Sequence, residues 1–226
     1  MRWALQPDES PLFGPARGCE ELEQRVLRFD GPGEPTPGGG ADEVLYVLRG
    51  TGRATLGDER IDLSPGTAAY RAAQTPWHVD AADGLQLLSV LIHDPLPADG
   101  AGHAVIVRDE TALGEATAGR MFRLLATPER GCASATQFVG YIPVGRAPDH
   151  YHRYDEVVYV LQGEGKLHVD GETAPLRAGS CIHLPSGLVH CVENSGPAEL
   201  QVLGVFRPAG SPAEAYYPDG TPAAEY

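Results

Sequence analysis

The chain is poor in several kinds of residue, and each scarcity argues against a class of protein. Aromatic residues make up only 7% of the 226 residues, and no apolar run approaches the roughly 18 residues that a membrane-spanning helix needs. The residues after Met1 lack the apolar core of a signal peptide. The sequence contains no Cys-x-x-Cys pair and only four scattered cysteines: Cys19, Cys132, Cys181 and Cys191. This favours free buried thiols in a reducing compartment, so we expect a soluble, cytoplasmic protein.

Basic residues are also scarce. There are 17 Lys and Arg against 31 Asp and Glu, and the formal net charge is −14. Nucleic acids and anionic membrane surfaces both require a basic face, so neither is an expected partner. No phosphate-binding Gly-x-x-x-x-Gly-Lys loop is present, and no serine lies in a nucleophile elbow. We expect the partner to be a small molecule, with no organic cofactor site and no assignable catalytic residue.

Glycine and proline, in contrast, are abundant. The 28 Gly and 20 Pro accompany a chain that is 42% apolar, a combination typical of many short strands joined by turns. Helix signals are few. Residues 110–122 have room for a helical turn, but Gly114 and Gly119 weaken it. The sequence therefore predicts an all-β protein.

The sequence repeats itself over a long period. Asp42-Glu43-Val44-Leu45-Tyr46-Val47-Leu48-Arg49-Gly50 aligns with Asp155-Glu156-Val157-Val158-Tyr159-Val160-Leu161-Gln162-Gly163 without a gap, and identities continue to Gly66 and Gly179. Such a repeat marks a duplicated structural unit. Each copy has the strand and turn spacing of a jelly-roll sandwich or barrel, and Asp170-Gly171 predicts a tight hairpin.

We therefore divide the chain into residues 1–95 and 96–226. The Pro- and Gly-rich segment 94–100 is predicted to connect the halves, with a strand that crosses between them as the alternative. The tail, residues 208–226, has no periodicity, but Tyr216, Tyr217 and Tyr226 suggest that parts of it pack onto the second half.

Two histidine-bearing patterns lie in the second copy. Gly145, His150, His152, Glu156 and Gly163 form the first pattern, and Gly179, Pro185, Gly187, His190 and Asn194 form the second. Side chains two apart on a strand share a face, about 7 Å apart, so His150, His152 and Glu156 are predicted to point the same way. With His190 from a second strand, they predict a transition-metal site. A single one of these histidines would more often be a solvated or hydrogen-bonded residue; the prediction depends on the combination.

Other side chains are candidates for the wall of this site. Tyr154 shares the parity of the ligands, Arg146 lies near the expected mouth, and Tyr141 lies on the preceding strand. Ordinary packing or solvation is an equally good interpretation of each. His168 and His183 stay undecided, because face assignments across separate strands are not settled by the sequence.

These patterns resemble the cupin superfamily, and the duplication resembles a bicupin. The resemblance is strongest over residues 138–206, and it implies two tandem double-stranded β-helix (jelly-roll) barrels. It also implies one divalent metal (manganese, iron, nickel or zinc) on His150, His152, Glu156 and His190 of the second barrel, with positions left for water or substrate. Because cupins often associate through edge strands, the resemblance further implies a homodimer.

The first copy does not carry the same ligand set. Pro37 and Gly39 align with His150 and His152, Glu43 is retained, and His78 can be matched to His190 only with a one-residue insertion. Two of four ligands rarely hold a metal, so we interpret Glu43 and His78 as structural. The first half is then expected to support the fold, an interface or a ligand lid.

Two functions of different class fit these features. The first is a metal-dependent enzyme that acts on a small polar or anionic metabolite, of dioxygenase, decarboxylase, isomerase or aminohydrolase type. The second is a non-catalytic protein that binds a small molecule or a metal as a sensor or store. Labile positions on the metal and convergent polar walls would favour the enzyme.

Overall fold

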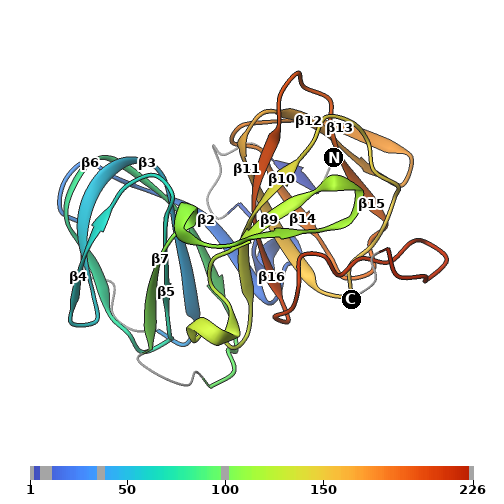
Figure 1. Ribbon diagram of the computed structural model, residues 1–226. Helices are drawn as coiled ribbons and strands as arrows, with labels where there is room; N and C mark the ends of the chain where they lie inside the picture. The colour runs from blue at the N-terminus through green and yellow to red at the C-terminus, as the bar shows by residue number, and fades with distance from the viewer. Residues whose placement is uncertain (1–2, 6–11, 35–38, 98–101, 224–226) are drawn as a thin grey trace.

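A computed structural model describes residues 3–5, 12–34, 39–97 and 102–223 of the chain. Two lobes of β-structure lie side by side (Figure 1). The described residues contain strands and four short 3-10 turns: η1 (Pro15–Arg17), η2 (Arg108–Glu110), η3 (Thr117–Gly119) and η4 (Pro128–Arg130). An all-β architecture was predicted, and it is confirmed. The helical turn expected within residues 110–122 is present only as η3, between strands.

The first lobe is built on one antiparallel sheet in the order β2-β6-β3-β5-β7, with β4 paired to β3. Its strands are β2 (Leu22–Phe29), β3 (Asp42–Leu56), β4 (Glu59–Leu63), β5 (Thr67–Arg71), β6 (Trp77–Ile92) and β7 (His103–Val107). The long strands β3 and β6 pair along most of their length, with register shifts that bend them. Because of this bending, one face encloses a core of apolar residues that includes Leu45, Val47, Leu56 and Leu87.

The second lobe has two sheets, in the orders β1-β14-β11-β16-β10-β9-β8 and β13-β12-β15. The strands are β1 (Ala4–Leu5), β8 (Leu113–Glu115), β9 (Met121–Leu124), β10 (Thr136–Ile142), β11 (Asp155–Gln162), β12 (Glu164–Val169), β13 (Glu172–Arg177), β14 (Cys181–Leu184), β15 (His190–Asn194) and β16 (Leu200–Arg207). Residues of both sheets form one core, for example Val160 from β11 and Leu167 from β12. Every strand pair in both lobes is antiparallel.

The sequence repeat has a counterpart in the backbone. Strand β3 begins at Asp42 and β11 begins at the aligned Asp155. The aligned turn residues Gly50 and Gly163 both have positive φ, 73° and 93°. Only glycine adopts this conformation without a steric cost, so the same residue type is required at both turns.

The hairpin predicted at Asp170-Gly171 joins β12 to β13. Both residues have positive φ, 51° and 77°, and the flanking residues Val169 and Glu172 are paired. Two consecutive left-handed residues are the mark of a type I′ turn, whose twist matches that of the flanking strands.

Sheet membership does not follow the boundary that we placed between residues 95 and 96. Strand β7 lies beyond that boundary, yet it pairs with β5 of the first lobe. Conversely, β1 comes from the start of the chain and pairs with β14 of the second lobe. The segment 94–100, for which we left a crossing strand as the alternative, lies partly outside the described residues, and β7 begins after it.

The lobes meet across a shared apolar core. It combines residues of the first lobe, such as Leu22 and Tyr70, with residues of the second, such as Val139, Val157 and Val205. The cysteines Cys19, Cys132 and Cys181 also lie in this core, and all four cysteines are buried and free, as predicted.

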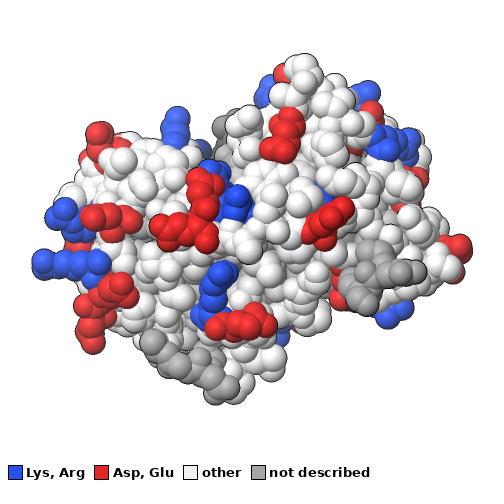
Figure 2. Space-filling view, in the orientation of Figure 1, with Lys and Arg blue, Asp and Glu red and all other residues white. Residues whose placement is uncertain are grey.

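The surface carries charges of both signs. On the face shown in Figure 2, acidic and basic side chains are interspersed over both lobes rather than gathered into a basic surface. Among the described residues, no helix has the length and apolar character that crossing a bilayer requires.

Candidate metal centre

The two histidine patterns are joined by their backbones. Gly145 and Asn194 exchange two N–H···O hydrogen bonds of 2.9 and 3.0 Å, and His150 and His190 exchange two of 3.0 and 2.8 Å. The buried amide of Asn194 donates to the carbonyls of Ile142 and Ala198, both at 2.8 Å. The ends of the two patterns therefore bring histidines from distant parts of the sequence to one place.

Three imidazoles converge at this place. One nitrogen of each of His150, His152 and His190 lies within 4.8 Å of those of the other two. The ring centroids are 4.7 to 5.2 Å apart. This spacing suits three ligands of one ion, because zinc and similar metals bind imidazole nitrogen at about 2.0–2.1 Å.

The other nitrogen of each ring has a backbone partner. The Nδ1 atoms of His150 and His190 lie 3.0 and 2.9 Å from the carbonyls of Pro148 and Leu188. Nδ1 of His152 lies 2.7 Å from the carbonyl of Glu214. A carbonyl can only accept, so each Nδ1 carries the proton and each Nε2 keeps a lone pair, the state that binds a metal.

Burial keeps these rings neutral. It lowers the pKa of His152 to about 3, lowers the pKa of His150, and holds the pKa of His190 well below its usual range. Because a protonated imidazole cannot ligate, a low pKa keeps the ligand form available across the neutral range.

The segment that carries two of these histidines is not the regular strand that we predicted. Strand β11 begins only at Asp155, and His150 joins the sheet through an isolated bridge. His152 is held from another direction, because its carbonyl accepts a hydrogen bond of 2.8 Å from the N–H of Gly187. The two rings still lie on one side of the chain, so the alternation holds although the strand does not.

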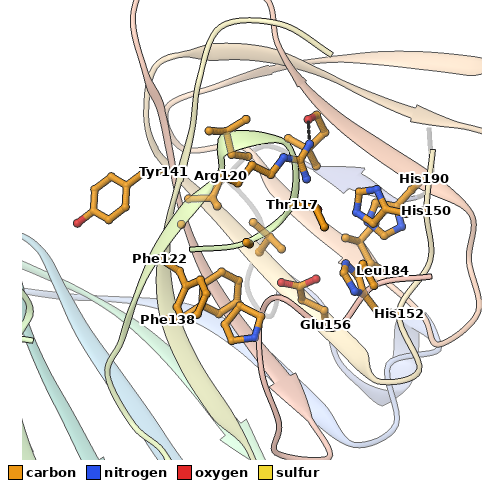
Figure 3. Close-up of a pocket in the computed structure, with 18 of the residues that line it drawn as sticks. Thr117, Arg120, Phe122, Phe138, Tyr141, His150, His152, Glu156, Leu184 and His190 are labelled. Atoms are coloured by element: carbon orange, nitrogen blue, oxygen red, sulfur yellow. Dashed lines mark hydrogen bonds between the residues drawn. The ribbon is translucent and has the colours of Figure 1, made fainter. Parts of the chain in front are cut away.

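Glu156, the predicted fourth ligand, lies at the start of β11 and lines the same pocket (Figure 3). It is 4% exposed, and burial raises its pKa to about 8, against the opposing charge of Arg120. Its carboxylate is not within the 4.8 Å group that the three imidazoles form. A cation bound among the imidazoles would favour the ionised form of this group.

A glycine makes room for this carboxylate. A Cβ added at Gly204 would lie 2.8 Å from Oε1 of Glu156 and would collide with the ring of Phe138. Gly204 pairs with Val158 and with Phe138 in the sheet. The absence of a side chain here lets Glu156 and Phe138 meet over the backbone.

The pocket has a volume of about 80 Å³. One water needs about 10–15 Å³ by the same measure, so the space holds on the order of six waters, or a metal with a small ligand. Apart from the metal-binding set, its walls are mostly apolar, including Phe122, Phe138, Val158 and Leu184. Such a wall excludes water and strengthens the few polar contacts inside.

The three residues predicted to form the wall of the site lie in different positions. Tyr154 lines the pocket, with its ring stacked between His152 and Phe206 at centroid distances of 4.7 and 4.0 Å. Tyr141 borders the pocket, but its ring points away from the histidines (Figure 3) and packs against the core between the lobes. Arg146 is not in the lining; it follows the turn at Gly145 and forms an exposed ion pair of 2.9 Å with Asp149.

The two undecided histidines lie elsewhere. His168 forms a 2.6 Å contact with Glu193 at the surface. His183 is buried between the rings of Trp3 and Phe13. It alternates with Leu184, which lines the pocket, so its ring is on the other face of β14.

Arg120 is the functional candidate that the sequence reasoning missed. It precedes β9 and extends over the pocket (Figure 3), where its Nη2 donates to the carbonyl of Val192 at 2.8 Å. Burial lowers its pKa, and the charge of Glu156 opposes this effect. Its position arises only when β9 pairs with β10, and a lone arginine after Gly119 gives no local signal of that.

The first lobe has a different arrangement at the corresponding place. Glu43 is 1% exposed and forms a 2.7 Å ion pair with Arg71, which is also buried. It also accepts a hydrogen bond of 3.1 Å from Nε1 of Trp77 and one from the hydroxyl of Ser89. The structural interpretation of Glu43 agrees with these contacts. Pro37, part of our alignment, lies outside the described residues.

Strand register corrects our match for His190. Leu56 pairs with Trp77 in the first lobe, as the aligned Val169 pairs with His190 in the second. Trp77 therefore occupies the place of His190 with no insertion. His78 is half-exposed and lies 2.8 Å from Asp80.

The site thus combines an all-β fold with three histidines whose ring nitrogens converge, a ligand set that suits a divalent metal ion. Residues 137–206 match the family model described as Cupin domain. This segment contains His150, His152, Glu156 and His190. The match and the fold together support the assignment of the chain to the cupin superfamily.

Comparisons with individual proteins agree with the family match. The oxalate-binding protein of Thermotoga maritima is 39% identical over 58 residues, which are 25% of this chain and 48% of that protein. An IolB-like protein from Salmonella typhimurium superposes with a TM-score of 0.75 at 15% identity, over 96% of this chain and 97% of that one. A variant of oxalate decarboxylase OxdC from Bacillus subtilis gives a TM-score of 0.71 at 16% identity, over 92% and 78%.

These similarities have different reach. Three of the curated relatives match over about half to three-fifths of their own length. The matches to solved structures cover nearly the whole of this chain. Because their sequence identity is low, these matches show only that the fold is similar.

Proposed function

We propose that His150, His152, His190 and Glu156 hold one divalent transition metal, with manganese, iron, nickel and zinc as the candidates. The observation that carries this proposal is the set of three carbonyl contacts that fix each imidazole with its Nδ1 protonated. Bound there, such an ion would supply a Lewis acid that holds an anionic ligand.

We further propose that the protein is an enzyme acting on a small carboxylate-bearing metabolite. Three features support this. The pocket has room for only a few atoms beside a metal, Arg120 brings a guanidinium to the same pocket, and a guanidinium suits a carboxylate through paired hydrogen bonds. One relative is named for binding oxalate, and oxalate is a compact dicarboxylate that tests the proposal well.

The metal is tested by its content in the purified protein and by titration with Mn²⁺ and Zn²⁺. We expect one ion per chain, lost in the variant His150→Ala. His168→Ala is the matched control, because this surface histidine lies outside the pocket. A wild-type protein that binds neither ion, or a His150→Ala variant that keeps the full affinity, would overturn the proposal.

The ligand is tested by calorimetric titration of the metal-loaded protein with oxalate, acetate and succinate. We expect Arg120→Gln to weaken binding of the preferred carboxylate about tenfold or more while metal content stays the same, since charge-assisted hydrogen bonds contribute about 1.5–3 kcal/mol. Arg146→Gln is the control, because Arg146 is outside the pocket. Equal carboxylate affinity in wild type and Arg120→Gln contradicts the role of Arg120.

A second function, carboxylate binding without chemistry, has one specific observation in its favour. Among the described residues that line the pocket, the side chains other than the proposed ligands that could transfer a proton are few, namely Thr117, Arg120, Tyr141 and Tyr154. The ring of Tyr154 is stacked and that of Tyr141 points away. Incubation of the metal-loaded protein with a bound carboxylate separates the two functions: product formation identifies the enzyme, and a stable complex identifies the binding protein.

We also propose that the chain is a bicupin, with the metal in the second lobe only, and that it forms a homodimer. The aligned turns of the two copies support the first point. Val105, Val107 and Leu113, exposed apolar residues of the terminal strands β7 and β8, support the second. Sedimentation that shows a monomer at micromolar concentrations contradicts the dimer.

A further inference from the structure

The segment after β16 crosses back to the metal centre. We call residues 211–223 the C-terminal strap; its residues are drawn in red at the end of the chain in Figure 1. The backbones of Tyr151 and Tyr216 exchange hydrogen bonds of 2.9 and 3.0 Å. Within the strap, Tyr217 and Thr221 close a turn, and the N–H of Ala223 donates to the carbonyl of Ala215 at 2.8 Å.

The strap is held by the same short segment that carries the ligands. Side chains alternate along residues 150–153: His150 and His152 face the metal centre, whereas Tyr151 and Arg153 face the strap. The ring of Tyr151 stacks on that of Tyr216 at 5.6 Å, and the guanidinium of Arg153 lies 3.9 Å from the centroid of the Tyr216 ring. A cation over an aromatic face contributes about 0.5–1 kcal/mol at an exposed site.

This contact has a direct consequence for one ligand. His150 and His190 find the acceptors for Nδ1 two residues back in their own segments, at Pro148 and Leu188. The acceptor for His152 is the carbonyl of Glu214, in the strap. The neighbours of Glu214 also reach the site, because Pro212 and Ala215 line the pocket.

We propose that the strap is a positioning element of the metal centre, and that Tyr216 acts through Glu214 to select the ligating tautomer of His152. The inference rests on the proposed function. While the strap is docked, the Glu214 carbonyl fixes the proton on Nδ1 and leaves the Nε2 lone pair for the metal. When Tyr216 no longer anchors the strap, Nδ1 loses its partner, the proton is shared between both nitrogens, and the ring is free to turn.

The first test reads the histidine itself, in the metal-free protein. Long-range ¹H–¹⁵N spectra of wild type should show His152 as the Nδ1–H tautomer. Tyr216→Ala should show a mixture of tautomers for His152 while His190 stays unchanged. The matched control is Tyr217→Ala, which removes the same ring one residue further along, where it forms no stacking contact with Tyr151. His152 remaining wholly Nδ1–H in Tyr216→Ala overturns the inference.

The second test titrates the same proteins with Mn²⁺ and Zn²⁺. We expect Tyr216→Ala to weaken binding about tenfold, because loss of a group that orients a ligand typically costs 10–100-fold, and Tyr217→Ala to bind as wild type does. Arg153→Ala, a change at an exposed residue that keeps the strap's own sequence, should weaken binding two- to threefold and guards against misfolding of the first variant.

The outcomes separate this inference from the proposed function. If wild type binds no divalent ion, the metal proposal fails, and the tautomer spectra still decide the role of Tyr216. If wild type binds metal and His150→Ala does not, but Tyr216→Ala and Arg153→Ala both bind with wild-type affinity, the strap inference alone is wrong.

Discussion

Glu43 and Glu156 occupy the same position of the repeat and are both buried, but their surroundings are opposite. The strand register identifies, for each polar partner of Glu43, the residue at the equivalent position of the second lobe, and its type is different each time. Arg71 corresponds to Leu184, Ser89 to Gly204 and Trp77 to His190. Arg25, whose Nη2 lies 3.4 Å from Oε1 of Glu43, corresponds to Phe138. Of these second-lobe residues, Leu184 and Phe138 are apolar, Gly204 has no side chain, and His190 carries an imidazole.

The difference shows two ways in which a buried carboxylate is accommodated in this chain. In the first lobe the chain itself supplies the counter-charge through Arg71. In the second, Glu156 forms no ion pair among the described residues, and burial raises its pKa to about 8. An unpaired buried acid is costly, so its retention beside three neutral imidazoles supports our proposal of a bound cation there.

The two lobes also differ in the volume of the cavity in their interior. The cavity among the apolar core residues of the first lobe measures about 10 Å³, which is at the limit for a single water. The pocket of the second lobe measures about 80 Å³. The first lobe has thus filled its interior, while the second keeps space for a ligand.

The largest effect is expected from breaking the ion pair of the first lobe. Glu43→Ala leaves Arg71 buried at 4% side-chain exposure without its partner, which should cost about 3–5 kcal/mol of unfolding free energy. Urea unfolding measures this loss. Adding Arg71→Leu should restore part of the stability, and metal content should not change. A variant as stable as wild type would show that the ion pair is dispensable.

The converse change gives the second lobe the buried arginine that the first lobe has. Leu184→Arg places a guanidinium opposite Glu156, as Arg71 lies opposite Glu43. We expect the charge to compete with a metal ion and to reduce affinity at least 100-fold, about 2.7 kcal/mol. Titration with Zn²⁺ measures it, and Leu184→Met is the control of similar volume. Retained affinity would mean that Glu156 plays no part in the metal site.

A smaller effect is expected at the position shared by Trp77 and His190. Trp77→Phe removes the Nε1–H that donates to Glu43 at 3.1 Å, a hydrogen bond to a charged group worth about 1.5–3 kcal/mol. The midpoint of chemical unfolding should fall, with no effect on metal binding. An unchanged midpoint would show that the hydrogen bond from Trp77 adds nothing measurable to stability.

The last prediction concerns pH. In the folded metal-free protein the pKa of Glu156 is raised from 4.5 to about 8. Between these values the folded state keeps a proton that the unfolded state releases, so this group lowers stability as pH rises. Relative to Glu156→Gln, the wild-type Tm should fall between pH 5 and pH 8 by about 2–4 °C for each kcal/mol lost. Parallel Tm curves for the two proteins in chelator-treated buffer would contradict the shift.

Local signals made part of the structure predictable. The Asp170-Gly171 turn and the aligned glycines depend on backbone conformations that few residues adopt, so sequence reveals them directly. The convergence of His150, His152 and His190 followed from spacing. Arg120 and Glu214 could not be found in this way, because one reaches the pocket through strand pairing and the other contributes a carbonyl that every residue possesses. For Arg146 the sequence left pocket wall and solvated surface as equal alternatives, and its exposed ion pair with Asp149 agrees with the second.

The exchange of strands between the lobes has a consequence for how the chain comes apart. Since β1 completes a sheet of the second lobe and β7 completes that of the first, a fragment cut near residue 95 would take one foreign strand with it and leave its own behind. Each fragment would expose an unpaired sheet edge and half of the core that the lobes share. The two lobes should accordingly unfold together, in one cooperative transition.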